Sequence, residues 1–258
     1  MLEEYDRAHI VQIIIGIRKY NIKMTLLYYI IMEKLGTNYG GWYVPINMNL
    51  NENSVVYSGG VGEDMSFDLL IQCKYNCNVL LIDPTNKAVK HFDEVKQYYN
   101  SNQVFTGDIQ PDYYYCIESL HPDLSKFKYV NIGLWNKKEE LKFYKQSNDK
   151  YVSQSLVENM FGQKYDIVPV DSIKNIMEQH GHTHIDLLKL DIEGAEIETV
   201  NQMLDDKIYP NYVLIEFDLL LKNKDPRNTT KQLIERMITK ENYKMLKNDQ
   251  LNITFVRT

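Results

Sequence analysis

Three short segments of this sequence are mostly apolar, and each is followed by a segment with helical spacing of apolar residues. They read NVLLID (78–83), HIDLLKLD (184–191) and YVLIEFD (212–218). Strands that are apolar on both faces are typical of a parallel sheet that helices cover on both sides. Alternating strands and helices form such a sheet. The sequence therefore predicts an α/β fold with a doubly wound, mostly parallel sheet.

The remaining elements follow from the same patterns. Further strands are expected at 54–58, 128–135 and 140–144, and helices at 64–75, 86–99, 171–179, 194–204 and 229–242. The segments YKMLK and LNITFVR, joined by the turn NDQ, are expected to form a C-terminal antiparallel hairpin.

The N-terminal part has a different pattern. Residues 3–20 and 23–35 show helical spacing, and GTNYGGWYVP (36–45) is expected to be a loop because glycine and proline interrupt it. We therefore expect an N-terminal helical extension and loop over 1–50, followed by an α/β domain over 51–258. The extension is expected either to cover a binding cleft or to make a homodimer contact.

Net charge, cysteine content and the length of apolar segments restrict the possible partners and the cellular location of the protein. The net charge of -6 argues against a nucleic-acid partner. Three cysteines and no recognisable cleavable signal favour a reducing, cytoplasmic location. The longest apolar stretch, at 24–32, is far shorter than the roughly 18–20 residues that span a bilayer, so no transmembrane segment is expected.

A glycine-rich turn and an acidic residue predict a cofactor site. SGGVGED (58–64) follows the first predicted strand, and Gly59, Gly60 and Gly62 allow close approach of the backbone to a ligand. Asp83 ends the next strand, at the spacing where a carboxylate accepts hydrogen bonds from a ribose diol. Together they favour a cofactor that contains adenosine.

The same turn discriminates between cofactors. Met65 stands where the dinucleotide fingerprint has its third glycine. Glu63 and Asp64 would compete with a pyrophosphate for the N-terminus of the helix. S-adenosylmethionine has no phosphate and carries a cationic sulfonium, so the sequence favours it over a nicotinamide dinucleotide.

The segments VYSGGVGEDMSFD, LLIDPT, NIGLW and above all HIDLLKLDIEGAE resemble the FkbM-like S-adenosylmethionine-dependent methyltransferases, from about Val55 to Asp218. The resemblance implies a class I methyltransferase fold, usually O-methylation, and sugars of glycans or natural products as frequent acceptors. It also implies that Gly60 and Gly62 lie along the methionine and ribose of the cofactor and that Gly133 and Leu134 border the adenine.

One position departs from the family pattern. The glycine motif often begins with an acid, and this chain has Ser58 there, which leaves Glu63, Asp64 or backbone carbonyls to hold the amine of the cofactor. The candidate cofactor-binding residues are Ser58, Gly59, Gly60, Gly62, Glu63, Asp83, Gly133, Leu134 and Asp191.

Three carboxylates are the candidate catalytic residues. Asp191 and Glu193 follow one predicted strand and Glu216 ends the next. Adjacent strands lie about 4.8 Å apart, so the three are expected to converge beside the methyl donor. A carboxylate can accept the proton that a hydroxyl loses on methylation. A carboxylate-held Mg²⁺ is a less favoured alternative, and no resident metal is expected.

Structural roles for these residues stay open. Asp191 could accept backbone N–H bonds, Glu193 could cap the following helix, and Lys189 could pair with Glu216. The histidines of HGHTH (180–184) precede a strand, so they are expected at the opposite edge of the sheet, in solvent.

Among the aromatic motifs, YYY (113–115) and GGWY (40–43) could stack on a sugar, although packing is the commoner fate. The leading prediction is O-methylation of a sugar hydroxyl on a saccharide acceptor. The alternatives are methylation of a small natural product and a non-catalytic module that retains the fold.

Overall fold

The computed structural model describes residues 31–106, 109–145, 154–158, 162–221, 225 and 227–258. The residues from Met32 to Thr258 form one compact unit. The helix predicted over 3–20 and most of that over 23–35 lie outside the described residues. No helix within these ranges is long and apolar enough to cross a membrane.

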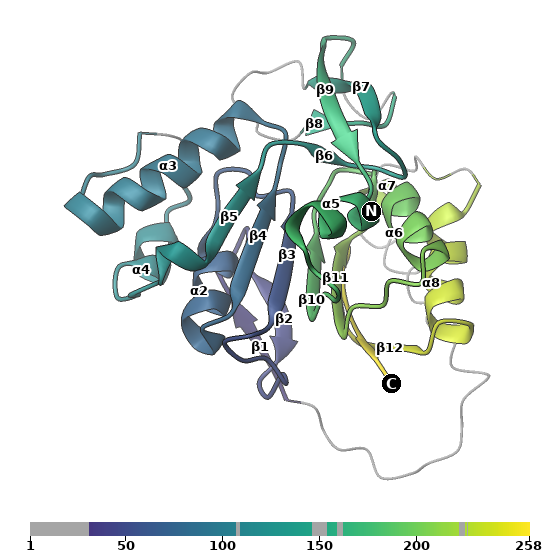
Figure 1. Ribbon diagram of the computed structural model, residues 1–258, viewed down its shortest axis with the longest axis horizontal. Coiled ribbons are helices and arrows are strands. Elements are labelled where there is room, and N and C mark those ends of the chain that lie inside the picture. Colours follow the sequence, from purple (N-terminus) through teal and green to yellow (C-terminus); the bar gives the residue numbers. More distant parts are fainter. Residues whose placement is uncertain (1–30, 107–108, 146–153, 159–161, 222–224, 226) are drawn as a thin grey trace, which may run out of the picture. The chain divides into compact units, whose positions relative to one another are not determined.

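The central sheet has seven strands in the order β12-β13-β11-β10-β3-β4-β5 (Figure 1). Five are parallel: β3 (Val55–Gly59), β4 (Asn78–Ile82), β5 (Phe127–Val130), β10 (Leu187–Leu190) and β11 (Tyr212–Glu216). The other two, β12 (Tyr243–Asp249) and β13 (Asn252–Arg257), pair antiparallel with each other, and β13 pairs antiparallel with β11. This sheet fits the predicted Rossmann-like fold.

The direction in which the strands are added reverses between β3 and β10. From β3 the chain adds β4 and then β5 on one side, and it later adds β10 and β11 on the other. Ligands of such sheets bind beyond the carboxyl ends of the strands at this reversal. Gly59, Ile82 and Leu190 are register partners in the three neighbouring strands, so the segments that follow them emerge together.

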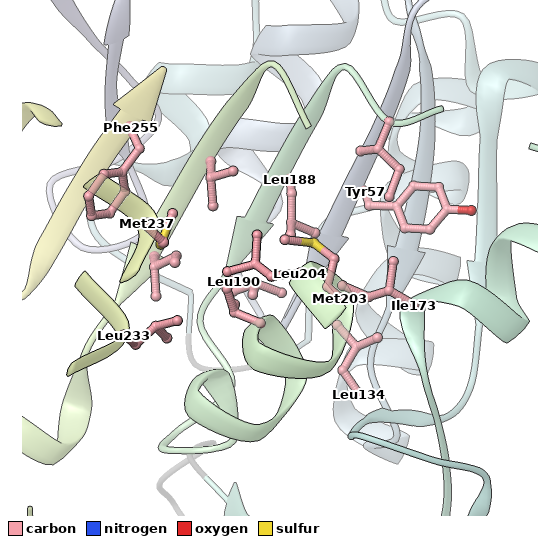
Figure 2. Packing of buried hydrophobic residues seen from close by; sticks show 14 of the residues in the cluster. Tyr57, Leu134, Ile173, Leu188, Leu190, Met203, Leu204, Leu233, Met237 and Phe255 are labelled. Carbon is pink, nitrogen blue, oxygen red and sulfur yellow. The ribbon is translucent and has the colours of Figure 1, made fainter. Parts of the chain in front are cut away.

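Helices cover both faces of the sheet, which explains why its strands are apolar throughout. On one face α5 (Ile173–His180), α6 (Glu196–Asp205) and α8 (Thr229–Thr239) pack against strand residues such as Leu188 and Leu190. Figure 2 shows Met203 and Leu204 of α6 and Met237 of α8 in this layer. On the other face α2 (Ser66–Tyr75), α3 (Asn86–Ser101) and α4 (Tyr113–Ile117) pack against the alternate strand residues. A short helix, α7 (Asp218–Leu221), follows β11.

A second, four-stranded sheet has the order β6-β9-β7-β8. Its strands are β6 (Gly133–Leu134), β7 (Glu139–Lys145), β8 (Gln154–Ser155) and β9 (Tyr165–Asp171). The prediction of one strand over 128–135 is therefore wrong, because the chain leaves the central sheet after Val130 and enters the second sheet at Gly133. A strand at 165–171 was not predicted.

The start of α5 also differs from the prediction, which made Asp171 the helix cap. The N-cap is Ser172, whose side chain accepts a hydrogen bond from the Asn175 N–H. Asp171 ends β9 and accepts hydrogen bonds from the Ser172 N–H and from the side chains of Asn175 and Gln179. Its carboxylate thus ties the strand to the helix.

Residues 32–45 form an antiparallel hairpin, β1 (Met32–Leu35) and β2 (Trp42–Pro45). The predicted helix over 23–35 is wrong for these last four residues, and the predicted loop over 36–45 contains β2. Leu35, Trp42 and Val44 are buried in the layer of α2 and α3. Strands of four residues are too short for their periodicity to be recognised, so the pattern favoured the wrong element.

Candidate active site

A cavity of about 550 Å³ lies at the carboxyl edge of the central sheet, beside the reversal between β3 and β10. Most of the predicted site residues line it: Gly60, Gly62, Glu63, Asp83, Gly133, Leu134, Asp191, Glu193 and Glu216. Ser58 and Gly59 are not among its lining residues, because they lie within β3 and Ser58 is fully buried.

The glycine turn requires glycine for reasons of geometry. Gly60 and Gly62 have positive φ angles of 74° and 58°, which side chains disfavour. A Cβ on Gly60 would also lie 1.6 Å from the carbonyl oxygen of Asp191. The turn is thus pressed against the strand end that carries the candidate base, and no larger residue fits between them.

Asp83 organises the glycine turn from the neighbouring strand. Its Oδ2 accepts hydrogen bonds from the N–H groups of Val61 (2.9 Å) and Gly62 (3.0 Å), and its Oδ1 accepts one from Thr85 (2.8 Å). A carboxylate has about four acceptor positions, so capacity for a ligand hydroxyl is left. The sequence predicted a ligand-binding role for Asp83 but did not indicate its role in the turn.

Lys189 holds the other side of the turn. Its Nζ donates hydrogen bonds to the carbonyl oxygens of Gly60 and Gly59, and it lies 5.8 Å from the centre of the Trp42 ring. The sequence left open an ion pair between Lys189 and Glu216. In the described part of the chain, no hydrogen bond or ion pair joins this buried ammonium group to Glu216. Lys189 therefore supports the backbone.

Asp191 directly follows β10, and Glu216 is the last residue of the adjacent parallel strand β11. Burial raises the pKa of Asp191, the charge of Asp83 raises it further, and Lys189 opposes the shift. Burial and the neighbouring charges of Asp191, Asp218 and Glu193 raise the pKa of Glu216 to about 9. Nearby carboxylates tend to share one proton, and the raised pKa of Glu216 favours Glu216 as the residue of this pair that holds it at neutral pH.

Glu193 lines the cavity from the loop after β10. It adopts a left-handed backbone conformation with φ of 54°, and its carbonyl oxygen accepts a hydrogen bond from the Ser155 hydroxyl (2.5 Å). The fully buried Glu196 accepts hydrogen bonds from the N–H groups of Ile192 (3.2 Å) and Gly194 (3.0 Å). Glu196 thus stabilises the loop, a role that the sequence had suggested for Asp191 or Glu193.

The turn between β1 and β2 contributes Asn38, Tyr39 and Gly40 to the cavity, and the sequence did not predict this. Thr37 anchors the turn, because its N–H donates to Ser66 Oγ (2.9 Å) and its hydroxyl donates to Asp64 Oδ2 (2.5 Å). In the sequence, the only indication of this turn was a short glycine-rich segment between two apolar segments.

Tyr39 extends from that turn toward the carboxylates. Its side chain is 67% exposed. Partial burial of its hydroxyl, followed by the negative charges of Asp191, Glu193 and Glu216, raises the pKa of Tyr39 to about 12. Burial is the largest cause of this shift, and the neighbouring carboxylates add to it.

The histidines of HGHTH and the aromatic residues of YYY and GGWY do not line the cavity. His182 Nδ1 and the Tyr57 hydroxyl are hydrogen-bonded at 2.8 Å, and His184 lies 3.2 Å from Asp186, before β10 begins. Tyr113 is fully buried and bonded to His91, and Trp42 is buried as well. Packing therefore accounts for these two aromatic residues. No group of three or more His, Cys, Asp and Glu residues in the described ranges is arranged to hold a metal ion.

The chain was compared with protein families, with curated protein sequences and with solved structures. The family model described as "Methyltransferase FkbM domain" matches residues 53–245. No curated protein sequence matches significantly.

Two solved structures are distantly similar in fold. The METTL16 MTase domain gives a TM-score of 0.39 at 10% identity, covering 80% of this chain and 59% of that one. A putative rRNA-methylase from Clostridium thermocellum gives a TM-score of 0.37 at 10% identity, covering 80% and 86%. The chain thus spans less than two thirds of the METTL16 structure. Because the family match extends from before β3 to within β12, the chain belongs to the FkbM methyltransferase family.

Proposed function

We propose that this protein is an S-adenosylmethionine-dependent O-methyltransferase that methylates a sugar hydroxyl of a glycan or glycoconjugate. One observation carries the proposal. The glycine turn organised by Asp83 and the carboxylates of Asp191 and Glu216 line the same cavity at the reversal of strand order. This arrangement would bring a methyl donor and a proton acceptor together in one cavity.

The residues present fit the cofactor. A ligand can approach the backbone at Gly60 and Gly62 because no side chain intervenes, and Asp83 retains acceptor capacity for ribose hydroxyls. Gly133 and Leu134 would border the adenine, and Glu63 would lie near the amine. Ser58 and Gly59 would support the turn from beneath. The bound cofactor supplies an electrophilic methyl group on a sulfonium.

The carboxylates of Asp191, Glu193 and Glu216 would act on the acceptor hydroxyl. When the acceptor oxygen takes the methyl group, the sulfur–methyl bond of the sulfonium would break and the thioether S-adenosylhomocysteine would leave. Asp191 would accept the proton that the acceptor oxygen loses. Glu216, protonated at neutral pH, donates a hydrogen bond that orients the acceptor. Glu193 would contact the acceptor from the loop after β10. The alternative, in which carboxylates hold Mg²⁺, predicts that EDTA abolishes turnover, whereas a carboxylate base predicts that EDTA has no effect.

Cofactor binding is tested by calorimetry with S-adenosylhomocysteine. Asp83→Ala removes the acceptor of two turn N–H groups, so we expect at least a tenfold loss of affinity. Asp123→Ala is the matched control, because the Asp123 carboxylate accepts hydrogen bonds from Ser125 and does not line the cavity. Equal affinities for the two variants would refute the cofactor placement.

Thermal unfolding identifies the cofactor class. A ligand at about 100 times its dissociation constant stabilises by about 2.7 kcal/mol, which corresponds to roughly 5–10 °C for a chain of this size. A rise with S-adenosylmethionine and S-adenosylhomocysteine but not with NAD supports the proposal. Binding without methylation of any saccharide or small hydroxyl compound would favour the non-catalytic alternative.

A further inference from the structure

The residues on either side of Ser155 line the cavity, and Ser155 itself does not. Gln154, in β8, and Leu156, directly after it, are lining residues, whereas the Ser155 side chain is fully buried. Successive side chains of an extended segment point to opposite sides. The segment 154–156 can therefore contact a ligand in the cavity on one side and another part of the protein on the other.

Leu156 lies at the end of the cavity where the adenine is proposed to bind. A Cβ on Gly133 would lie 3.4 Å from Leu156 Cδ1 and 3.8 Å from Pro84 Cγ, so both side chains pack beside Gly133. Both also line the cavity. The faces of a purine ring are largely apolar, so an adenine beside Gly133 would bury more of the partly exposed Leu156 side chain.

The Ser155 hydroxyl joins β8 to the loop after β10. Its Oγ donates a hydrogen bond to the carbonyl oxygen of Glu193 (2.5 Å) and accepts one from the Val157 N–H (2.9 Å). A hydroxyl has one proton to donate, and here it is used for the Glu193 carbonyl. The contact thus connects two segments that lie 38 residues apart in the sequence.

The loop after β10 depends on such contacts because its backbone is unusual. Glu193 and Gly194 have positive φ angles of 54° and 102°. A residue other than glycine keeps this conformation where its surroundings determine it. Glu196 fixes the loop through the N–H groups of Ile192 and Gly194, and Ser155 fixes it through the carbonyl of Glu193. The position of β8 therefore bears on the conformation of the loop.

The strand β8 is short. Its two residues pair with β7, Ser155 with Tyr144 and Gln154 with Lys145, whereas strands commonly have five or six residues. Segments with few contacts open at a low free energy, so a ligand that adds contacts can stabilise them. An adenine against Leu156 would therefore hold β8 in place.

We propose that Ser155 is a positioning residue that couples the cofactor end of the cavity to its acceptor end. When adenine packs against Leu156, β8 is held, and the Ser155 hydroxyl then holds the loop that contains Glu193. The coupling implies that the cofactor binds before the acceptor. The inference rests on the proposed function and adds an order of binding to it.

Hydrogen exchange measured by mass spectrometry tests the coupling without an acceptor. Adenosine is the probe, because it lacks the homocysteine part of S-adenosylhomocysteine and binds through its base and ribose. In the wild type, adenosine at millimolar concentration should slow exchange by at least about threefold over 154–158 and over 191–195. In Ser155→Ala the slowing over 154–158 should remain, and that over 191–195 should be lost. Equal slowing over 191–195 in both proteins, or its loss over 154–158 in the variant, would overturn the inference.

Ser101→Ala is the matched control. It removes a serine hydroxyl that donates to a backbone carbonyl, that of Gln97 (2.8 Å), away from the cavity, and it should behave as the wild type. A purely structural role of Ser155 would speed exchange over 191–195 by the same factor with and without adenosine. That result would refute the coupling even if Ser155→Ala were less stable.

Leu156→Ala tests the same coupling from the cofactor end. It should weaken adenosine binding by about five- to tenfold, because apolar contact is lost. With the adenosine concentration raised to give equal occupancy, this variant should show no slowing over 154–158 or over 191–195. Slowing over 191–195 that survives in Leu156→Ala would exclude a route through β8.

The two proposals fail separately. If S-adenosylhomocysteine does not bind to the wild-type protein, the proposed function is wrong. If it binds and adenosine slows exchange over neither segment of the wild type, or over 154–158 alone, only the inference about Ser155 is wrong.

Discussion

Replacing Glu216 with glutamine should stabilise the protein, and the gain should grow with pH. The folded protein raises the pKa of Glu216 from its ordinary value of 4.5 to about 9. Between these values the folded state holds a proton that the unfolded state has released, so stability is lost as pH rises through this range. Glutamine is a neutral isostere that does not titrate, and the variant should not share this loss.

The magnitude follows from the size of the shift. One pH unit corresponds to about 1.36 kcal/mol, so three units, from pH 5 to pH 8, give an upper limit of about 4 kcal/mol. The Glu216 side chain is partly exposed and interacts with Asp191, and solvent screening weakens such effects. We therefore expect the variant to gain about 2 kcal/mol on the wild type over this interval, roughly 4–8 °C in Tm.

Urea unfolding of wild type, Glu216→Gln and the exposed control Glu235→Gln at pH 5 and pH 8 measures this directly. A stability gap between Glu216→Gln and wild type that is the same at both pH values would refute the raised pKa. Activity gives a second readout. Glutamine keeps a hydrogen-bond donor, so Glu216→Gln should retain more turnover than Glu216→Ala, and the reverse order would exclude a protonated Glu216.

Further predictions concern the turn and the base. Gly60→Ala should destabilise the protein by more than about 3 kcal/mol, because its Cβ would meet the Asp191 carbonyl. Gly181→Ala, with φ of 68° and nothing within 4 Å of the added Cβ, should cost only about 1 kcal/mol; similar losses in urea unfolding would contradict the steric argument. Asp191→Asn should leave S-adenosylhomocysteine affinity within about threefold and lower turnover by at least about a hundredfold, and full turnover in a radiolabelled methyl-transfer assay would remove Asp191 from the mechanism.

The loops of the cavity are organised by buried acids that do not take part in the proposed chemistry. Asp83 holds the glycine turn and Glu196 holds the loop after β10, each by accepting backbone N–H bonds. Burial and the neighbouring charge of Asp218 raise the pKa of Glu196 well above its ordinary value. Such groups cost stability, and we interpret them as the means by which Gly60 and Asp191 are kept in contact.

The central sheet, and the edge at which the candidate site lies, could be predicted from local sequence patterns. Parallel strands between two helical layers must be apolar on both faces, so segments such as NVLLID were recognisable. Because every parallel strand ends at the same edge, the sequence also placed Gly60, Asp83, Asp191 and Glu216 near one another without any knowledge of loop structure.

Other elements and residue roles depend on contacts between distant segments, so they could not be predicted from the sequence. The β1–β2 hairpin is too short for periodicity to reveal it, and Tyr39 reaches the cavity only because Thr37 is anchored to Asp64 and Ser66. Glu196, and not Glu193, accepts the backbone N–H bonds that stabilise the loop after β10. This depends on the backbone torsion angles of the loop, in which Glu193 is left-handed. The proton on Glu216 depends on burial and on charges from three other positions. These properties arise from distances between segments, and local sequence patterns do not encode them.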